Sequence, residues 1–160
     1  MRNMKNTLKQ TMLFVMICAW MITPVTAVAD GGEFHGTYLT TITLDGKFAS
    51  RSVLTFHSDR TMSVVDSAQI RQDLTFSEQQ GAWKRRGNHV VGQTIDFTFT
   101  PTPGLARNDY DLIVDEQNAK LSGHIELRIY EMDGDPLHDD GVLIGIYDVT
   151  GTRLKIKRPN

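Results

Sequence analysis

Residues 76–99, FSEQQGAWKRRGNHVVGQTIDFTF, decide the fold of this 160-residue chain. Two runs of strand-forming residues flank Gly87-Asn88, a dipeptide that is typical of a two-residue hairpin turn. The first run carries Trp83, and the second ends on Phe97 and Phe99. The pattern predicts that this stretch is the central β-hairpin of an all-β barrel.

The register of this hairpin is a question that the sequence poses directly. A two-residue turn would pair Trp83 with Gly92 and place the indole on the face of Val90, with Phe97 on the opposite face. A shift of one residue exchanges the two faces of a strand. Because we expect Trp83 and Phe97 to be buried together, we predict an odd-length loop or a bulge.

The rest of the chain has the same rhythm of short apolar runs and turn residues, and it shows no long amphipathic helix after Asp30. Regularly spaced short strands are typical of a sandwich or barrel. The weakest pattern, at 66–80, is compatible with a short helix or a long loop. The expected strands are 36–44, 48–57, 61–65, 81–86, 89–100, 109–115, 120–131, and a last hairpin of 142–150 and 152–157 across Gly151.

Eight or nine strands joined mostly by short links indicate an antiparallel up-and-down meander, and closure into a barrel removes the sheet edges. Period-two alternation predicts the faces of two strands. In the second expected strand the inward set is Phe48, Ser50, Ser52, Leu54 and Phe56. In 120–131 the apolar set is Leu121, Ile125, Leu127 and Ile129, opposite Ser122, His124, Glu126, Arg128 and Tyr130.

The first residues predict a secretory signal peptide. Basic residues precede an uncharged apolar run at 12–22, and Ala27-Val28-Ala29 has the small-x-small pattern of a cleavage site. The run is about half of the ~20 residues that span a bilayer, and Ile17 before Cys18 disfavours a lipid anchor. We therefore expect a signal peptide at 1–29, one β-barrel domain at 30–160, no membrane span after cleavage, and export to the periplasm or medium.

Charge and cysteine content exclude several classes of function. The whole chain has 17 Lys+Arg and 19 Asp+Glu; because the expected leader holds three of the basic residues, residues 30–160 carry a net charge of −5. A mildly acidic domain is a poor candidate for nucleic-acid binding. The single cysteine lies in the leader, which excludes thiol catalysis and a disulfide scaffold for the rest.

Three short pieces carry a resemblance to a known group: Gly36-Thr37-Tyr38, the run 55–61 (TFHSDRT), and Gly81-Ala82-Trp83 before a Gly-Asn turn. In these pieces and in strand rhythm the chain resembles bacterial lipocalin-like proteins of the calycin group. It departs from the lipocalin pattern because Gly-x-Trp lies in the middle of the chain rather than on the first strand. The resemblance implies a calycin-like barrel, and the related allene oxide cyclase-like barrels make a cyclase or isomerase the alternative to a ligand carrier.

Alternation selects a candidate pocket in the barrel interior. Apolar pockets with a few polar groups are the usual form of small-molecule sites. The leading hypothesis is therefore an exported protein that holds a small apolar or amphipathic molecule. The expected pocket residues are Tyr38, Ser52, Leu54, Phe56, Trp83, Gln93, Phe97 and Leu127.

Two other functions stay open at this point. A cyclase or isomerase would act by confining its substrate, with Tyr38, Tyr110 or His124 as proton donors. A filled barrel would instead be an envelope interaction module that works through its outer face. No nucleophile elbow or other catalytic motif is present, and the sequence does not indicate the oligomeric state.

The acidic segment 133–141, DGDPLHDDG, contains four carboxylates and a histidine. Its spacing fails as a calcium loop, since Leu137 and Ile144 stand where an EF-hand needs oxygen ligands. His35, His57, His89, His124 and His138 show no zinc-ligand spacing, and Lys84-Arg85-Arg86 fits a solvated turn. We therefore expect no metal and no cofactor.

Overall fold

The structure is a computed structural model that describes residues 35–71 and 73–155. The predicted signal peptide lies outside the described residues. Within the described part of the chain, no helix is long and apolar enough to cross a membrane.

The described chain is almost entirely β-structure. Mostly short connections separate the strands, and a 3-10 turn, Ser67–Gln69, follows the third of them. The strands are β1 (Gly36–Leu44), β2 (Lys47–Phe56), β3 (Thr61–Asp66), β4 (Ile70–Arg71), β5 (Leu74–Phe76), β6 (Gln79–Arg86), β7 (His89–Thr100), β8 (Gly104–Asp115), β9 (Lys120–Tyr130) and β10 (Val142–Arg153).

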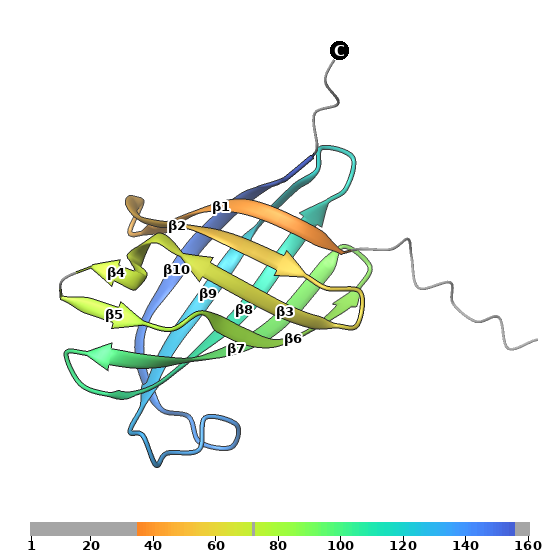
Figure 1. Ribbon diagram of the computed structural model, residues 1–160. Helices are drawn as coiled ribbons and strands as arrows, with labels where there is room; N and C mark the ends of the chain where they lie inside the picture. Colours follow the sequence, from red (N-terminus) through yellow and green to blue (C-terminus); the bar gives the residue numbers. More distant parts are fainter. Residues whose placement is uncertain (1–34, 72, 156–160) are drawn as a thin grey trace, which may run out of the picture. The chain divides into compact units, whose positions relative to one another are not determined.

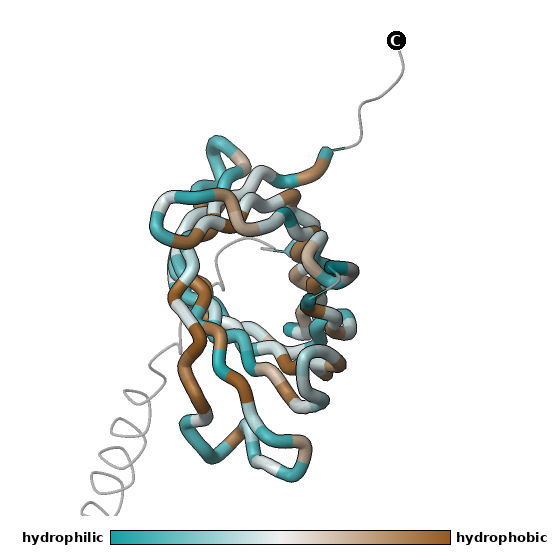
Figure 2. Tube along the Cα trace, turned by 90° about the vertical axis from the view of Figure 1, so that its left-hand side faces the viewer, coloured by the Kyte–Doolittle hydropathy of each residue, from teal (hydrophilic) through white to brown (hydrophobic). Residues whose placement is uncertain are grey.

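Eight of these strands form a closed antiparallel barrel (Figure 1). The ring runs β1-β2-β3-β6-β7-β8-β9-β10, and pairing of β10 with β1 closes it. Figure 2 shows the strands as a ring around the interior. The short strands β4 and β5 pair with each other, and β5 pairs with the last residues of β7, along the same edge of β7 that pairs with β6. The predicted all-β, up-and-down barrel is therefore confirmed.

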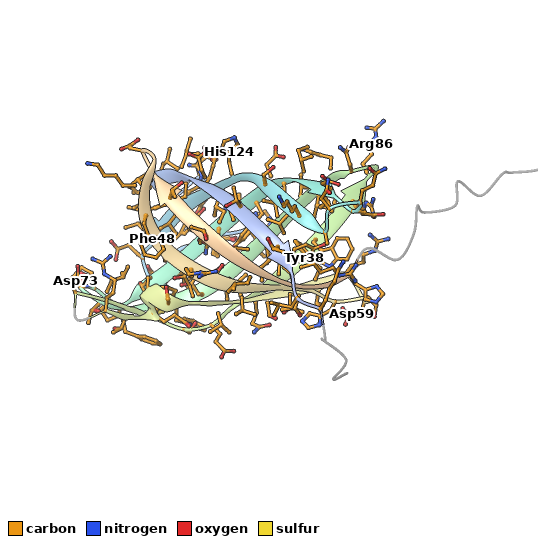
Figure 3. All side chains as sticks on the ribbon, turned by 90° about the horizontal axis from the view of Figure 1, so that it is seen from above. Tyr38, Phe48, Asp59, Asp73, Arg86 and His124 are labelled. Carbon is orange, nitrogen blue, oxygen red and sulfur yellow. The ribbon has the colours of Figure 1, made fainter. Side chains whose placement is uncertain are left out.

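The two ends of the barrel differ. We call the end that carries turns 57–60, 87–88 and 116–119 the tryptophan end, and the end that carries 45–46, 67–78, 101–103 and 131–141 the loop end. In Figure 3, Asp59 and Arg86 mark the tryptophan end and Asp73 marks the loop end.

The largest differences from the predicted strand boundaries are in β10 and β8, and the short strands β4 and β5 lie where a short helix or a long loop was expected. The hairpin expected across Gly151 is wrong, because β10 continues through it and Gly151 pairs with Thr40 on one side and Leu121 on the other. A Cβ at Gly151 would lie 3.0 Å from Cγ2 of Thr40, so the glycine permits close packing rather than a turn. Strand β8 begins at Gly104, five residues before the predicted start at 109.

The central hairpin keeps the two-residue turn, and the predicted odd loop or bulge is wrong. Arg86 pairs with His89 and Trp83 with Gly92, without a register shift. Trp83 is 6% exposed inside the barrel, whereas Phe97 is 51% exposed on the outside. Gly92 has no side chain opposite the indole, and a Cβ there would lie 2.5 Å from Sδ of Met62. Turn chemistry therefore overrides the expected burial of the phenylalanines.

A register shift between Ile42 and Thr43 changes one of the inward residues predicted for the second strand. Ser50, Ser52, Leu54 and Phe56 are buried as predicted, but Phe48 lies beyond the bulge and is mostly exposed.

Aromatic packing fills the tryptophan end. The ring of Phe56 lies edge-on to Trp83 at 5.4 Å and to Tyr38 at 6.0 Å. The indole Nε1 donates to the carbonyl oxygen of His57 at 3.2 Å, and the Arg60 guanidinium lies 4.7 Å from the indole centroid. Met62, Leu112, Val114 and Leu121 also belong to this core.

Candidate functional site

The interior changes character toward the loop end, where polar side chains replace the apolar core. Cross-strand partners point to the same face of a sheet, so the register of the strands identifies the inward residues. The buried polar residues are Thr40, Ser50, Ser52, Asp66, Gln79, Thr94, Asp96 and Asn108, and with Tyr110 we call them the polar layer.

Hydrogen bonds join residues of the polar layer across strands. Oε1 of Gln79 accepts from Oγ1 of Thr94 at 2.9 Å and from the Tyr110 hydroxyl at 2.7 Å. Nδ2 of Asn108 donates to Oδ1 of Asp96 at 3.0 Å, and the Ser50 hydroxyl donates to Oδ2 of Asp66 at 2.9 Å. The layer is therefore a preorganised set of polar groups rather than a packed hydrophobic core.

Two carboxyl groups in this layer have perturbed acidity. Burial, together with the nearby negative charge of Asp66, raises the pKa of Asp96 to about 7, although the hydrogen bond from Asn108 opposes the shift. Burial also raises the pKa of Asp66, against hydrogen bonds from the Ala68 amide and Ser50. Carboxyl groups with such pKa values are concentrated at functional sites.

One oxygen of Asp96 is uncommitted. Every buried side-chain nitrogen and oxygen of the described residues has a hydrogen-bond partner. Oδ1 of Asp96 accepts from Asn108, but none of the described residues donates to Oδ2. Oδ2 is therefore not fully buried, although Asp96 as a whole is only 4% exposed.

A row of inward residues leads from Asp96 to the loop end. Asp96 pairs with Ala106, Ala106 with Ile129, and Ile129 with Val142. Exposure rises along the row from 4% and 3% for the first two to 39% for Ile129 and 63% for Val142. Ile129 and Val142 thus face the barrel axis and yet meet solvent. They form an apolar lip above the polar layer.

The structure brings most of the predicted pocket residues into the interior. Tyr38, Leu54, Phe56 and Trp83 belong to the aromatic core of the tryptophan end, Ser52 lies in the polar layer, and Leu127 pairs with Asn108 near the lip. The inward placement of Gln93 and Phe97 is wrong. They lie on the outer face of β7, where Nε2 of Gln93 donates to Oδ1 of Asp109 at 2.7 Å.

Of the three predicted proton donors, one lies on the outer face of the barrel and two lie inside it. His124 lies on the outer face of β9, 3.0 Å from Asp148, and its side chain projects outward in Figure 3. Tyr38 and Tyr110 are inside, and burial raises the pKa of both phenols. Sequence reasoning missed the interior carboxyl group of Asp96, whose pKa burial raises to about 7.

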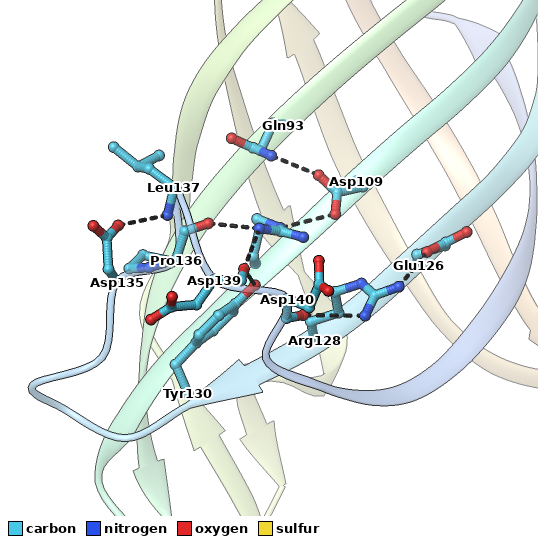
Figure 4. Close-up of polar contacts among 11 residues, drawn as sticks. Gln93, Asp109, Glu126, Arg128, Tyr130, Asp135, Pro136, Leu137, Asp139 and Asp140 are labelled. Carbon is cyan, nitrogen blue, oxygen red and sulfur yellow. Dashed lines mark hydrogen bonds and ion pairs between the residues drawn. The ribbon is translucent and has the colours of Figure 1, made fainter.

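The acidic loop between β9 and β10 folds against the outside of the barrel (Figure 4). Nη1 of Arg107 donates to the carbonyl oxygens of Pro136 at 2.7 Å and Asp139 at 3.1 Å, while its Nε donates to Asp109 at 2.9 Å. Arg107 alternates with the buried Ala106 and is therefore on the outer face. The loop is thus held beside the lip and not across it.

Replacing Arg107 by alanine is expected to release this loop. Because backbone carbonyls in the loop would lose their charged donor, cleavage within 132–141 by a nonspecific protease should accelerate severalfold, with a change of about 1 kcal/mol in global stability. Limited proteolysis with mass mapping measures this. Arg86→Ala, at the exposed hairpin tip, is the control, and equal cleavage rates in both variants would contradict the role of Arg107.

Two hollows on the outer surface accompany the interior site. One, of ≈ 700 Å³, is lined mainly by outward residues of β1, β8, β9 and β10. The other, of ≈ 340 Å³, is lined by Asp109, Tyr110, Asp111, His124, Glu126 and Ile146. Neither contains Asp96. Over the described ranges, no group of three or more His, Cys, Asp or Glu side chains converges in a way that could hold a metal ion.

Comparison with protein-family models, curated proteins and solved structures gives no significant match.

Proposed function

We propose that this protein is an exported barrel that binds a small apolar or amphipathic molecule through its loop end. The observation that carries the proposal is the apolar lip: Ile129 and Val142 face the axis but remain exposed above buried polar groups. An apolar wall with a few oriented polar groups is the usual chemistry of a small-molecule site.

The remaining features support the same reading. The tryptophan end is filled by aromatic side chains, so a ligand would enter from the loop end. The acidic loop does not lie across that end, because Arg107 holds it to the outside. The lipocalin-like pieces of the sequence favour the calycin type of barrel, and the leader pattern favours export to the periplasm or medium.

Dye binding by matched variants tests the proposal. The inward pair Ile129→Ser with Val142→Ser should weaken binding of Nile red about fivefold or more, because the lip would lose apolar contact area. The outward pair Leu143→Ser with Ile146→Ser removes similar exposed apolar groups from the outer face of the barrel. This pair should change Nile red binding little. A larger effect of the outward pair would overturn the interior site.

Native mass spectrometry of the protein purified from the periplasm or medium gives a second test. We expect a retained small molecule that Nile red displaces. A protein that retains no molecule and binds no dye is not a carrier.

An acid–base enzyme acting on a confined substrate is the second candidate. The pKa of Asp96, about 7, favours it, because a general acid or base works best when it titrates near the operating pH. Incubation of the retained molecule with fresh protein decides between the two functions. A change in its mass or chromatographic position that Asp96→Asn abolishes would favour the enzyme over the carrier.

A further inference from the structure

We propose that the polar end of the bound molecule is a protonated amine that donates to Asp96 inside the barrel. This inference rests on the proposed function and names the class of ligand. Its geometric basis is the pair of inward carboxylates, Asp66 on β3 and Asp96 on β7, in one interior layer.

The two carboxylates are equipped differently. Both oxygens of Asp66 are occupied, since Oδ2 accepts from Ser50 and Oδ1 accepts from the Ala68 amide at 2.7 Å. Asp96 has one oxygen held by Asn108 and the other uncommitted and accessible. Asp96 is therefore the group with free capacity to accept hydrogen bonds from a ligand.

The charge around Asp96 favours a cation. The effects that act on its carboxyl group are burial, Asn108 and the negative charge of Asp66, and none comes from a basic side chain. The inward arginines, Arg85 and Arg153, pair in register with Val90 and Tyr38 toward the tryptophan end. Tyr110 is the other titratable group of the layer. Its hydroxyl group donates a hydrogen bond to Gln79, and it supplies no positive charge.

An ammonium group fits these acceptors. It is a compact cation with three donors and no acceptor. It could donate to Oδ2 of Asp96 and to the amide oxygen of Asn108. The amide nitrogen of Asn108 already donates to Oδ1 of Asp96. A bound cation would favour the ionised form of Asp96, which burial alone disfavours.

The apolar part of such a ligand would follow the inward row toward solvent. The row from Asp96 passes the small Ala106 and reaches Ile129 and Val142. An alkylamine placed with its nitrogen at Asp96 would therefore lay its chain against the apolar lip.

Calorimetric titration with three probes of equal chain length tests this inference. At pH 8, below their micellar concentrations, dodecylammonium should bind at least tenfold more tightly than dodecanol, and dodecanoate should bind most weakly. Asp96→Asn should reduce dodecylammonium affinity about tenfold or more and leave dodecanol affinity within twofold. Asp133→Asn, on the exposed acidic loop, is the matched control and should leave all three affinities unchanged.

Lowering the pH separates charge from shape. Between pH 8 and pH 5.5 dodecylammonium affinity should fall about tenfold in the wild-type protein, because Asp96 becomes protonated, and should stay constant in Asp96→Asn. Equal binding of the three probes, or unchanged amine binding in folded Asp96→Asn, overturns the amine while leaving the carrier intact. Failure of all three probes to bind overturns both proposals.

Discussion

Replacing Asp96 by asparagine is expected to stabilise the ligand-free protein at pH 8 by up to about 4 kcal/mol, a gain that disappears as the pH approaches 4. The folded state holds the pKa of this carboxyl group at about 7, against 3.8 for an aspartate in water. Between these values the unfolded chain has lost the proton and the folded chain keeps it. Stability of the wild-type protein therefore falls as the pH rises from 4 to 7 and then levels off.

Urea unfolding at pH 4.5, 6 and 8 measures this dependence. Asparagine preserves the shape and keeps an oxygen that accepts from Asn108, so the variant should show a flatter pH profile and an unchanged slope against urea. Asp133→Asn, in the exposed loop, should shift stability by about 0.5 kcal/mol or less. Destabilisation by Asp96→Asn at pH 8 would show that the folded protein stabilises the ionised carboxylate.

Truncation of Trp83 to alanine is expected to cost roughly 3 to 5 kcal/mol, as is typical of large aromatic residues in a core. The indole is buried, contacts Phe56 edge-on and donates to His57. Phe97→Ala removes a ring that is half exposed on the outer face and should cost about 1 kcal/mol or less.

The two variants together test the hairpin register through chemical denaturation. Trp83→Ala should lower the denaturation midpoint strongly, with Phe97→Ala close to wild type. A larger loss in Phe97→Ala would restore the register in which the phenylalanines face inward.

The sequence predicted the barrel because turn residues and strand-forming runs specify elements locally. The bounds of β1 and β7 follow from flanking glycine, asparagine and proline signals. The faces of β9 follow from its alternation, since Leu121 and Ile125 are buried. These features need no knowledge of distant strands.

The failures concentrate at the loop end, where the usual pattern is inverted. On β7 the inward residues are Thr94 and Asp96, while the outward ones include Phe97 and Phe99. A rule that buries apolar residues necessarily assigns this half of the strand to the wrong face. The start of β8 was missed for the same reason, because its inward residues are the small Ala106 and the polar Asn108.

This inversion is consistent with the proposed binding site. Placing a carboxylate in the interior where an apolar residue would stabilise the fold has a cost, and such departures are expected at functional sites. The sequence did contain a signal for this site. Gly92, Thr94 and Asp96 alternate with period two on the predicted central hairpin, and they mark a face without large apolar residues.

Methyl NMR with a nitroxide-labelled long-chain alcohol tests the interior binding site most directly. A bound probe should broaden the methyl signals of Leu127, Ile129 and Val142, which face the axis, and leave those of Leu143 and Ile146 on the outer face sharp. Broadening confined to the outer methyl groups, with Ile129 and Val142 unaffected, would contradict a ligand site inside the barrel.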